Sequence, residues 1–466
     1  MSSSRRMVKL AFTFLAGSAM SKVLVFALLP VYTRYLPPDE FGYYDLAVTC
    51  ITIVMSLLFM DVWVTTMRFM YRSEMDDDKN AAVRAGATLF VFSSAVLVAG
   101  AVLVGLLVDI RYLWLLVAYG ITTNLREFYG SVARGWDRNL AFTLSGTLNT
   151  FVTVGLNVLL LIGLSWDFSA LFVASIVGNL VQCIWLELVT RTRGAWKSGF
   201  DRARLMSVVR FSLPLGVNSV AYWLMTGFGK IVVQQELSLT QNGYFAIGSR
   251  FSALIVVAAS IVTMAWQDVS FSRGTDDRDG FYRRASQYFL VFTGFGLALL
   301  LPLISLSFPY VVGDAYEAAY PMMPLFVIVA AVGAFSSLVG NIFYALDRTG
   351  IVFYSTLLSC AVSVGLCIPF VRWWGVDGVN IAILAAFVVN IAVRSVVLSR
   401  LVSFGYSFRD SSIVLFVVVG AVLTYRTSTP WLNAVYALLV AALFALVYAR
   451  GMIGLLRKRA VASVGQ

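Results

Sequence analysis

Two positively charged side chains lie inside long apolar runs of the sequence. Lys22 stands within Leu10–Val31, thirteen residues after Lys9, and Arg250 stands within Tyr244–Trp266. If the first run is a membrane helix, a rise of about 1.5 Å per residue puts Lys22 roughly 20 Å beyond Lys9. A charge at such depth costs about 2.5–3.5 kcal/mol on insertion scales. Two cations cannot neutralise each other, so this pair favours a hydrated central cavity that receives an anion.

Four further charged residues complete the set of candidates. Asp61 and Glu127 stand in the second and fourth apolar runs, where a carboxylate is able to load a proton or help to bind Na⁺. Lys230 and Arg34 stand near outer ends of runs and are candidate contacts of the anion or interfacial residues. The alternative is a structural role, in which Lys22 forms a buried ion pair with Asp61 or Glu127.

The apolar runs determine the fold class. Hydrophobic residues make up 60% of the 466 residues and the mean hydropathy is +0.84, which excludes a soluble globular protein. A helix needs about 20 apolar residues to cross a bilayer, and we expect the first run to be retained as a helix. The sequence predicts an all-α polytopic membrane protein with about 14 transmembrane helices; a twelve-helix protein with a re-entrant tail is the alternative. The runs are Leu10–Val31, Tyr43–Met67, Ala85–Val108, Leu113–Ala133, Leu140–Leu164, Ala170–Leu188, Phe211–Val233, Tyr244–Trp266, Tyr288–Phe308, Pro321–Leu346, Ile351–Val371, Val379–Val402, Ile413–Tyr425 and Leu432–Tyr448.

The basic residues predict the topology. Most of the 35 lysines and arginines fall in the two tails and in alternate gaps between the runs, and Arg394 is counted among these gap residues. Cytoplasmic loops carry such an excess, so both termini are expected in the cytoplasm. This placement explains the net charge of +11 without nucleic-acid binding.

Short motifs recur in the two halves of the sequence. Gly42-Tyr43-Tyr44 and Gly243-Tyr244-Phe245 are offset by 201 residues, and Asp137-Arg138 and Asp347-Arg348 by 210. Their order predicts two parallel six-helix lobes related by a pseudo-two-fold axis along the membrane normal. The predicted divisions are an N-terminal lobe (1–190), a basic cytoplasmic linker (191–210), a C-terminal lobe (211–403), and two appended helices with a basic tail (404–466). The substrate path is expected between the lobes.

Enzymatic signatures are missing from the sequence. There is no histidine, and no Walker A, G-x-S-x-G or H-E-x-x-H motif. We therefore expect no catalytic residues, no cofactor and no metal site. A membrane glycosyltransferase or polymerase would need acids at the outer face, where Asp314 and Glu317 are the only notable pair. The four cysteines lie in apolar runs without a CxxC spacing: Cys50, Cys183, Cys360 and Cys367.

The first two runs resemble the opening of O-antigen and polysaccharide flippases, in the multidrug/oligosaccharidyl-lipid/polysaccharide exporter superfamily. The resemblance rests on Gly17–Lys22, Leu28–Leu36 and Glu40–Leu46, and more loosely on Phe211–Leu215, Gly243–Ile247 and Arg250. It implies a flippase of the bacterial inner membrane that moves undecaprenyl-diphosphate-linked oligosaccharide to the outer leaflet by alternating access. Membrane lipids, and possible polysaccharide polymerase and glycosyltransferase partners, follow from the same resemblance.

The resemblance also implies roles for particular residues. Lys22 and Arg250 stand where the family often carries a cation, so they are the expected contacts of the diphosphate or of an acidic sugar. Where the family often has Asp-Arg, this chain has Gly229-Lys230. The cation is kept and the adjacent carboxylate is lost, which puts ion coupling through that acid in doubt.

Two other transporters of the same superfamily are alternatives. A peptidoglycan-precursor (lipid II) flippase fits fourteen runs better, although the motif in the first run favours the polysaccharide branch. An ion-coupled multidrug exporter would more naturally carry a cavity rich in carboxylates, whereas Lys22 and Arg250 are positive.

Overall fold

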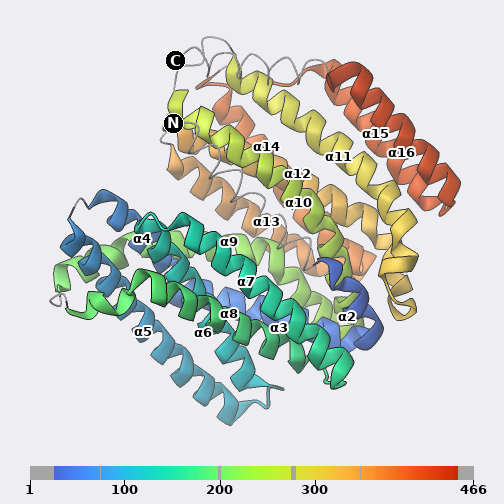
Figure 1. Cartoon of the computed structure of the whole chain (residues 1–466). Coiled ribbons are helices and arrows are strands. Elements are labelled where there is room, and N and C mark those ends of the chain that lie inside the picture. Colours follow the sequence, from blue (N-terminus) through green and yellow to red (C-terminus); the bar gives the residue numbers. More distant parts are fainter. Residues whose placement is uncertain are drawn as a thin grey trace. The chain divides into compact units, whose positions relative to one another are not determined.

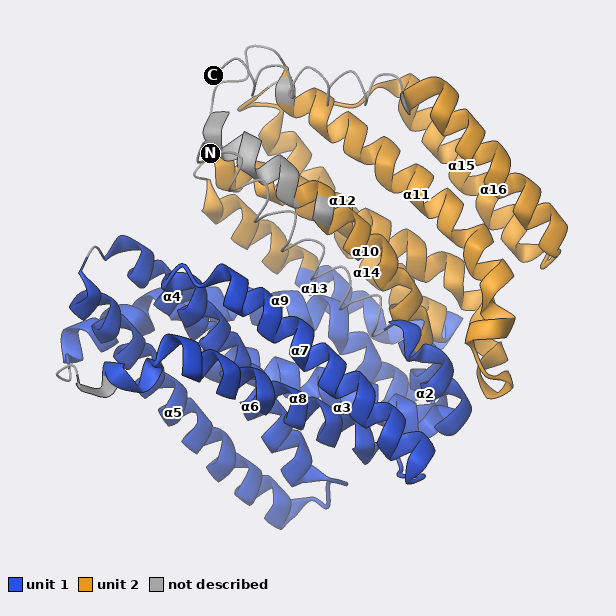
Figure 2. Cartoon of the chain, viewed as in Figure 1, with its two compact units in different colours: residues 1–246, 360–375 blue, residues 247–359, 376–466 orange. Residues whose placement is uncertain are grey.

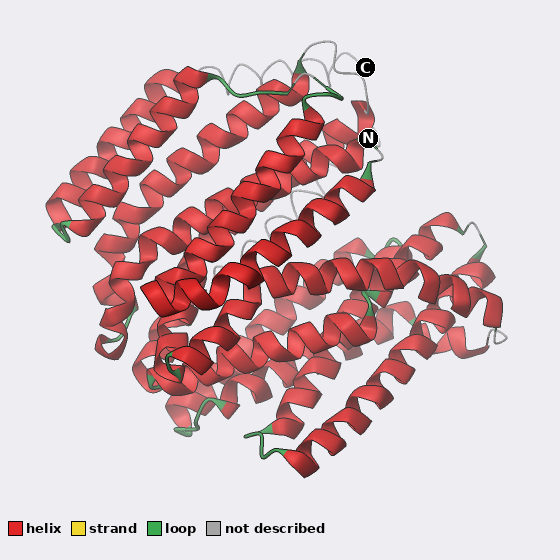
Figure 3. Ribbon diagram, turned by 180° about the vertical axis from the view of Figure 1, so that it is seen from behind, coloured by secondary structure: helices red, strands yellow, loops and turns green. Residues whose placement is uncertain are grey.

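The computed structural model describes residues 26–73, 75–197, 201–273, 280–346, 348–402 and 404–449. These residues form helices joined by short connections, with no strand among them (Figures 1 and 3). The α-helices are α2 (Leu29–Tyr35), α3 (Pro38–Phe59), α4 (Val62–Arg72), α5 (Asp76–Leu107), α6 (Leu113–Gly135), α7 (Asn139–Val158), α8 (Ser169–Thr190), α9 (Arg202–Glu236), α10 (Leu239–Arg273), α11 (Phe281–Val311), α12 (Met323–Ala345), α13 (Thr349–Trp374), α14 (Val376–Leu398), α15 (Phe408–Arg426) and α16 (Pro430–Phe444). Short 3₁₀ and π segments cover Thr192–Lys197, Asp314–Met322, Leu159–Gly163 and Ala445–Ala449.

The predicted all-α membrane fold is confirmed. Within the described part of the chain, eleven helices are long and apolar enough to cross a membrane. Helices α6 and α9 also coincide with predicted runs, but they are less apolar because they carry charges such as Arg126, Glu127 and Lys230. Most of the run Leu10–Val31 lies outside the described residues, so the number of fourteen transmembrane helices stays a prediction.

The chain packs into two compact units (Figure 2). Unit 1 comprises residues 1–246 and 360–375, and unit 2 comprises residues 247–359 and 376–466. The chain passes from one unit to the other within α10 and within α13. This grouping follows packing, whereas the lobes of residues 1–190 and 211–403 follow the sequence repeat and stay a prediction.

Unit 1 is built around α3, α6 and α9. Helix α3 packs along α9, while α4 packs against α5 and α6, and α8 packs against α6 and α7. Its core contains Phe59, Phe90 and Phe128, whose tilted rings pack one against the next with ring centroids 4.9 and 5.9 Å apart. Aromatic burial of this kind holds the helices at fixed spacing.

Unit 2 places α12 against α14 and α11. The C-terminal helices α15 and α16 both pack on α11, and Tyr425 stacks on Tyr320 with ring centroids 4.5 Å apart. Much of the apolar surface of α15 and α16 stays exposed, including Phe416 and Leu438. Apolar side chains that face outward are expected where lipid is the solvent.

Helices α3 and α4 are separated by a sharp break rather than continuing as one rod. Met60 and Asp61 both adopt the left-handed region, with φ of 49° and 50°. Neither residue is glycine, so each costs roughly 1 kcal/mol or more in backbone energy. The predicted run Tyr43–Met67 is therefore two helices, and Asp61 stands at the joint.

Candidate functional site

An ion pair buried between α3 and α9 is the centre of the candidate site. Lys230 Nζ lies 2.6 Å from Asp45 Oδ2, and the two side chains are only 14% and 10% exposed. Removing such charges from water is costly, so each ion needs the other to remain charged. Lys230, which the sequence places near an outer end, is therefore a paired, largely buried cation.

A neutral side chain also binds the Lys230 ammonium. Lys230 Nζ donates to Thr49 Oγ1 at 3.1 Å, and that hydroxyl itself donates to the carbonyl oxygen of Asp45 at 2.8 Å. The Phe245 ring has its centroid 5.8 Å from Nζ, and Asn242 Nδ2 donates to the carbonyl oxygen of Lys230 at 2.9 Å. Hydroxyl, carboxylate and aromatic ring together form a small cage for one positive charge.

Glycines allow the helices around this cage to approach closely. A Cβ on Gly227 would lie 2.7 Å from Thr49 Cγ2, so α9 reaches α3 only because residue 227 is glycine. At the start of α10, a Cβ on Gly243 would overlap the carbonyl oxygen of Pro38, and one on Gly42 would overlap that of Leu239. Backbone contact of this kind requires a residue without a side chain.

Asp61 occupies a second polar contact between the same parts of unit 1. Ser219 Oγ in α9 donates a short hydrogen bond to Asp61 Oδ2, and a Cβ on Gly216 would lie 2.8 Å from Met60 Cα. Ser219 and Lys230 are eleven residues apart in α9, or roughly 16 Å at 1.5 Å per residue. Asp61 and Lys230 therefore belong to separate clusters along one helix pair.

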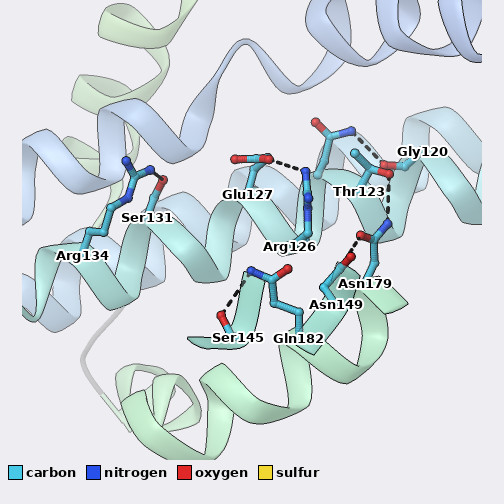
Figure 4. Close-up of polar contacts among 11 residues, drawn as sticks. Gly120, Thr123, Arg126, Glu127, Ser131, Arg134, Ser145, Asn149, Asn179 and Gln182 are labelled. Atoms are coloured by element: carbon cyan, nitrogen blue, oxygen red, sulfur yellow. Dashed lines mark hydrogen bonds and ion pairs between the residues drawn. The ribbon is translucent and has the colours of Figure 1, made fainter. Parts of the chain in front are cut away.

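Glu127 is paired with its neighbour in α6. Arg126 Nη2 lies 2.5 Å from Glu127 Oε1, with the side chains 33% and 40% exposed (Figure 4). The carboxylates of Glu127 and Asp61 also repel each other as like charges. The two carboxylates predicted for ion coupling thus influence each other, and one of them already has an arginine partner.

A polar seam follows α6, α7 and α8, and we define it by five residues. Asn149 Nδ2 donates to Asn179 Oδ1 at 3.0 Å, and Asn179 Nδ2 donates to Thr123 Oγ1 at 3.1 Å (Figure 4). Gln182 Nε2 donates to Ser145 Oγ at 3.2 Å. Such side-chain bonds commonly join helices in membrane bundles, and here they join α6, α7 and α8.

The predicted placement of Arg394 in a gap between helices is wrong. It was counted among the gap residues, but it lies in α14 of unit 2 and is only 5% exposed. Its guanidinium donates to Ser336 O at 2.8 Å, Ser355 Oγ at 2.9 Å and Thr356 Oγ1 at 3.1 Å. Among the described residues its hydrogen-bond acceptors are neutral, so this deep cation is solvated by serine, threonine and backbone oxygens.

A charged cluster connects two loops of unit 1. Arg111 Nη2 lies 2.8 Å from Asp167 Oδ2 and the Arg111 guanidinium packs 4.6 Å from the Phe168 ring centroid. Burial alone would raise the pKa of Asp167, but hydrogen bonds from Ser169 and Tyr112 and the charge of Arg111 outweigh it and lower that pKa. Next to the cluster, residues 105, 108–110 and 112–115 line a hollow of about 370 Å³. The cluster also contacts the start of α3, where Glu40 Oε1 lies 3.8 Å from Arg111 Nη2.

Two other predicted cations, Arg34 and Arg250, belong to different units. Arg34 is exposed in the last turn of α2, and Arg250 is partly exposed in the part of α10 that belongs to unit 2. Lys22 lies outside the described residues. Among those residues no group of three His, Cys, Asp or Glu side chains is placed to hold a metal ion.

The sequence analysis did not single out Asp45. The residue was noted only as part of the Glu40–Leu46 motif, although it is an acid seven residues into the apolar helix α3. The cost argument that selected Asp61 applies equally to Asp45. Gly229 has no carboxylate to offer its neighbour Lys230, and Asp45 of α3 provides one instead.

Comparison with solved structures shows the fold. The chain is similar to the lipid II flippase MurJ in an inward closed conformation, with a TM-score of 0.74, 14% identity, and coverage of 94% of this chain and 99% of that one. An inward-facing multidrug resistance MATE family transporter of the MOP superfamily gives a TM-score of 0.66 at 14% identity, covering 84% and 98%. An outward-facing MATE transporter gives 0.59 at 15% identity, covering 87% and 95%.

Comparison with sequences shows the family. No curated protein matches the chain. The sequence profile described as polysaccharide biosynthesis protein matches residues 8–271, which is more than half of the 466 residues. Helices α2 to α9, with the Lys230–Asp45 ion pair, fall inside this match. The chain therefore belongs to the polysaccharide biosynthesis protein family and has the fold of MOP-superfamily transporters.

Proposed function

We propose that this multi-pass membrane protein is a flippase for undecaprenyl-diphosphate-linked oligosaccharide, working by alternating access. The single observation that carries the proposal is the buried, caged cation Lys230 in a transporter fold of the polysaccharide biosynthesis protein family. A diphosphate headgroup cannot shed its water in hydrocarbon without cations to receive it. Lys22, Arg250 and Arg34 are proposed as further contacts of the headgroup.

The remaining predictions belong to the same proposal. The N-terminal lobe (1–190) and the C-terminal lobe (211–403) would rock to expose the headgroup first to the cytoplasm and then outside. Residues 404–466 would add the two appended helices and the cytoplasmic tail. The protein would reside in the bacterial inner membrane with both termini in the cytoplasm. A polysaccharide polymerase and glycosyltransferases would be its partners, since they consume and supply the lipid-linked glycan.

The test is a flipping assay in proteoliposomes. A fluorescent polyprenyl-diphosphate oligosaccharide is placed in both leaflets, and a membrane-impermeant quencher reports the fraction exposed outside. We expect the protein to make nearly all of the fluorophore accessible over time, while protein-free liposomes stay at about half. Lys22→Ala should lower the rate without changing the amount of inserted protein. Accessibility that stays at half with the full-length protein present would overturn the proposal.

A lipid II flippase is the second candidate. The likeness to MurJ covers 94% of the chain, whereas the likeness to the inward-facing MATE transporter covers 84%. Both likenesses concern the fold, so the substrate has to be separated by experiment. The same assay with lipid II in place of the oligosaccharide lipid discriminates: faster flipping of lipid II would move the assignment to this candidate.

A further inference from the structure

The two ions of the Lys230 cage are held differently. The ammonium keeps a neutral anchor, because the Thr49 hydroxyl is positioned by its own bond to the Asp45 carbonyl and accepts from Nζ. The carboxylate lacks an equivalent anchor at its contacting atom. Asp45 Oδ2 is buried and makes no hydrogen bond among the described residues, although it lies 2.6 Å from Nζ. Among the described residues, Lys230 Nζ is therefore the partner on which this oxygen depends.

A pair of this type is a weak source of stability. The desolvation of two buried ions can exceed their Coulombic attraction, and apolar replacements of such pairs are often neutral. A lysine ammonium is a compact point charge that does not impose the bidentate geometry of arginine, so one anion can replace another beside it. The carboxylate held only by charge is the group that a stronger anion displaces.

We propose that Asp45 is the exchangeable counter-ion of Lys230. An incoming diphosphate takes the place of the Asp45 carboxylate beside the ammonium while Thr49 keeps Nζ in position. The return of Asp45 then expels the diphosphate. Asp45 acts as a positioning residue that weakens binding and speeds release, and it deepens the proposed function, on which it rests. The site takes the diphosphate class of anion, whichever glycan is attached.

The experiment measures binding and turnover separately. Binding to the purified full-length protein uses a short-chain polyprenyl-diphosphate disaccharide, with inorganic pyrophosphate as the competitor. We expect Asp45→Asn to tighten Kd about tenfold, equivalent to 1.4 kcal/mol, and to slow flipping at saturating substrate. The combined variant Asp45→Asn with Lys230→Met should lose this gain in affinity, because the cation that binds the diphosphate is absent. The split between tighter binding and slower turnover is a result that a purely structural ion pair would not produce.

A matched control lies on α9, the helix that carries Lys230. Glu236, near the end of α9, forms a two-point contact with Arg372, with Nη2 2.8 Å from Oε1 and Nε 2.9 Å from Oε2. Glu236→Gln removes one carboxylate charge from a paired site six residues from Lys230. It should leave both Kd and the flipping rate within about twofold of the wild type.

A charge exchange keeps the proposal testable should Asp45→Asn fold poorly. Asp45→Lys combined with Lys230→Asp preserves an ion pair with the cation on α3. If the ion pair is purely structural, the exchanged variant should fold and should flip its substrate normally, and this result would overturn the proposal. If Asp45 is instead an exchangeable counter-ion, this variant should fold but lose binding, because the cation has moved from α9 to α3. An unchanged or weaker Kd in Asp45→Asn, with a wild type that binds and flips, would also overturn it while leaving the flippase assignment intact. A wild type that neither binds nor flips refutes the proposed function itself.

Discussion

Gly42 in α3 and Gly243 in α10 meet backbone to backbone, and they are equivalent residues of the two Gly-Tyr motifs in the sequence. A Cβ on Gly42 would lie 2.6 Å from the backbone nitrogen of Gly243 as well as overlapping Leu239, and a Cβ on Gly243 would overlap Pro38. The two glycines that the sequence repeat makes equivalent are therefore in direct contact. The contact also sets the distance between α3 and the Phe245 ring, which lies over Lys230.

Adding a methyl group at this contact should destabilise unit 1. Gly243→Ala forces backbone atoms apart, and overpacking of this kind typically costs about 1–3 kcal/mol. We expect a clear fall in the thermal midpoint of the detergent-solubilised protein, followed by tryptophan fluorescence. Gly100→Ala is the matched control, because a Cβ at Gly100 of α5 has no heavy atom within 4 Å. An equal midpoint for the two variants would show that the glycine contact is dispensable.

Asp61→Asn separates the charge of Asp61 from its backbone conformation. Asparagine adopts the left-handed region readily and keeps an oxygen that accepts from Ser219, so we expect a stability change within about 0.5 kcal/mol. If Asp61 couples transport to an ion, this variant should flip substrate at a rate that ionophores no longer lower. Flipping that still depends on the gradient in Asp61→Asn would remove Asp61 from ion coupling. Asp61→Val, which disfavours φ near 50°, provides the conformational control.

Arg394 should tolerate methionine better than lysine. Lysine keeps a buried positive charge but cannot reach Ser336, Ser355 and Thr356 at once, so it loses several charge-assisted bonds, each worth about 1.5–3 kcal/mol. Methionine removes the charge and fills similar volume. We expect the thermal midpoint of Arg394→Lys to lie below that of Arg394→Met. The reverse order would mean that the positive charge itself is required at this position of α14.

The Arg111–Asp167 loop contact should respond to acid. Because the pKa of Asp167 is lowered by folding, its stabilising contribution is present above its unfolded value near 3.8 and is lost as the pH falls through the folded value. Thermal midpoints of the wild type and Asp167→Asn, measured from pH 7 down to about pH 3, should differ at neutral pH and converge at the acid end. A constant difference across this range would contradict the assignment.

The apolar runs were sufficient to predict the membrane class and the positions of most helices, whereas the family was indicated by a resemblance in short motifs such as Gly17–Lys22 and Glu40–Leu46. These properties are local, because the length and hydropathy of one run decide whether it forms a membrane helix. The Gly-Tyr motif recurs in the sequence at Gly42 and Gly243, and the structure shows that these two glycines are in contact. Deep charges were also correctly regarded as costly, since that cost belongs to the single residue.

Only the tertiary structure decided which of those charges are paired and with what. Lys230 meets Asp45 across 185 residues of sequence, Asp61 meets Ser219 across 158, and Arg394 is solvated by residues of α12 and α13. Hydropathy records depth, but it carries no information on the angle at which one helix faces another. That angle depends on packing through glycines such as Gly227 and on the left-handed break at Met60 and Asp61, and these have no signature in a single run of residues.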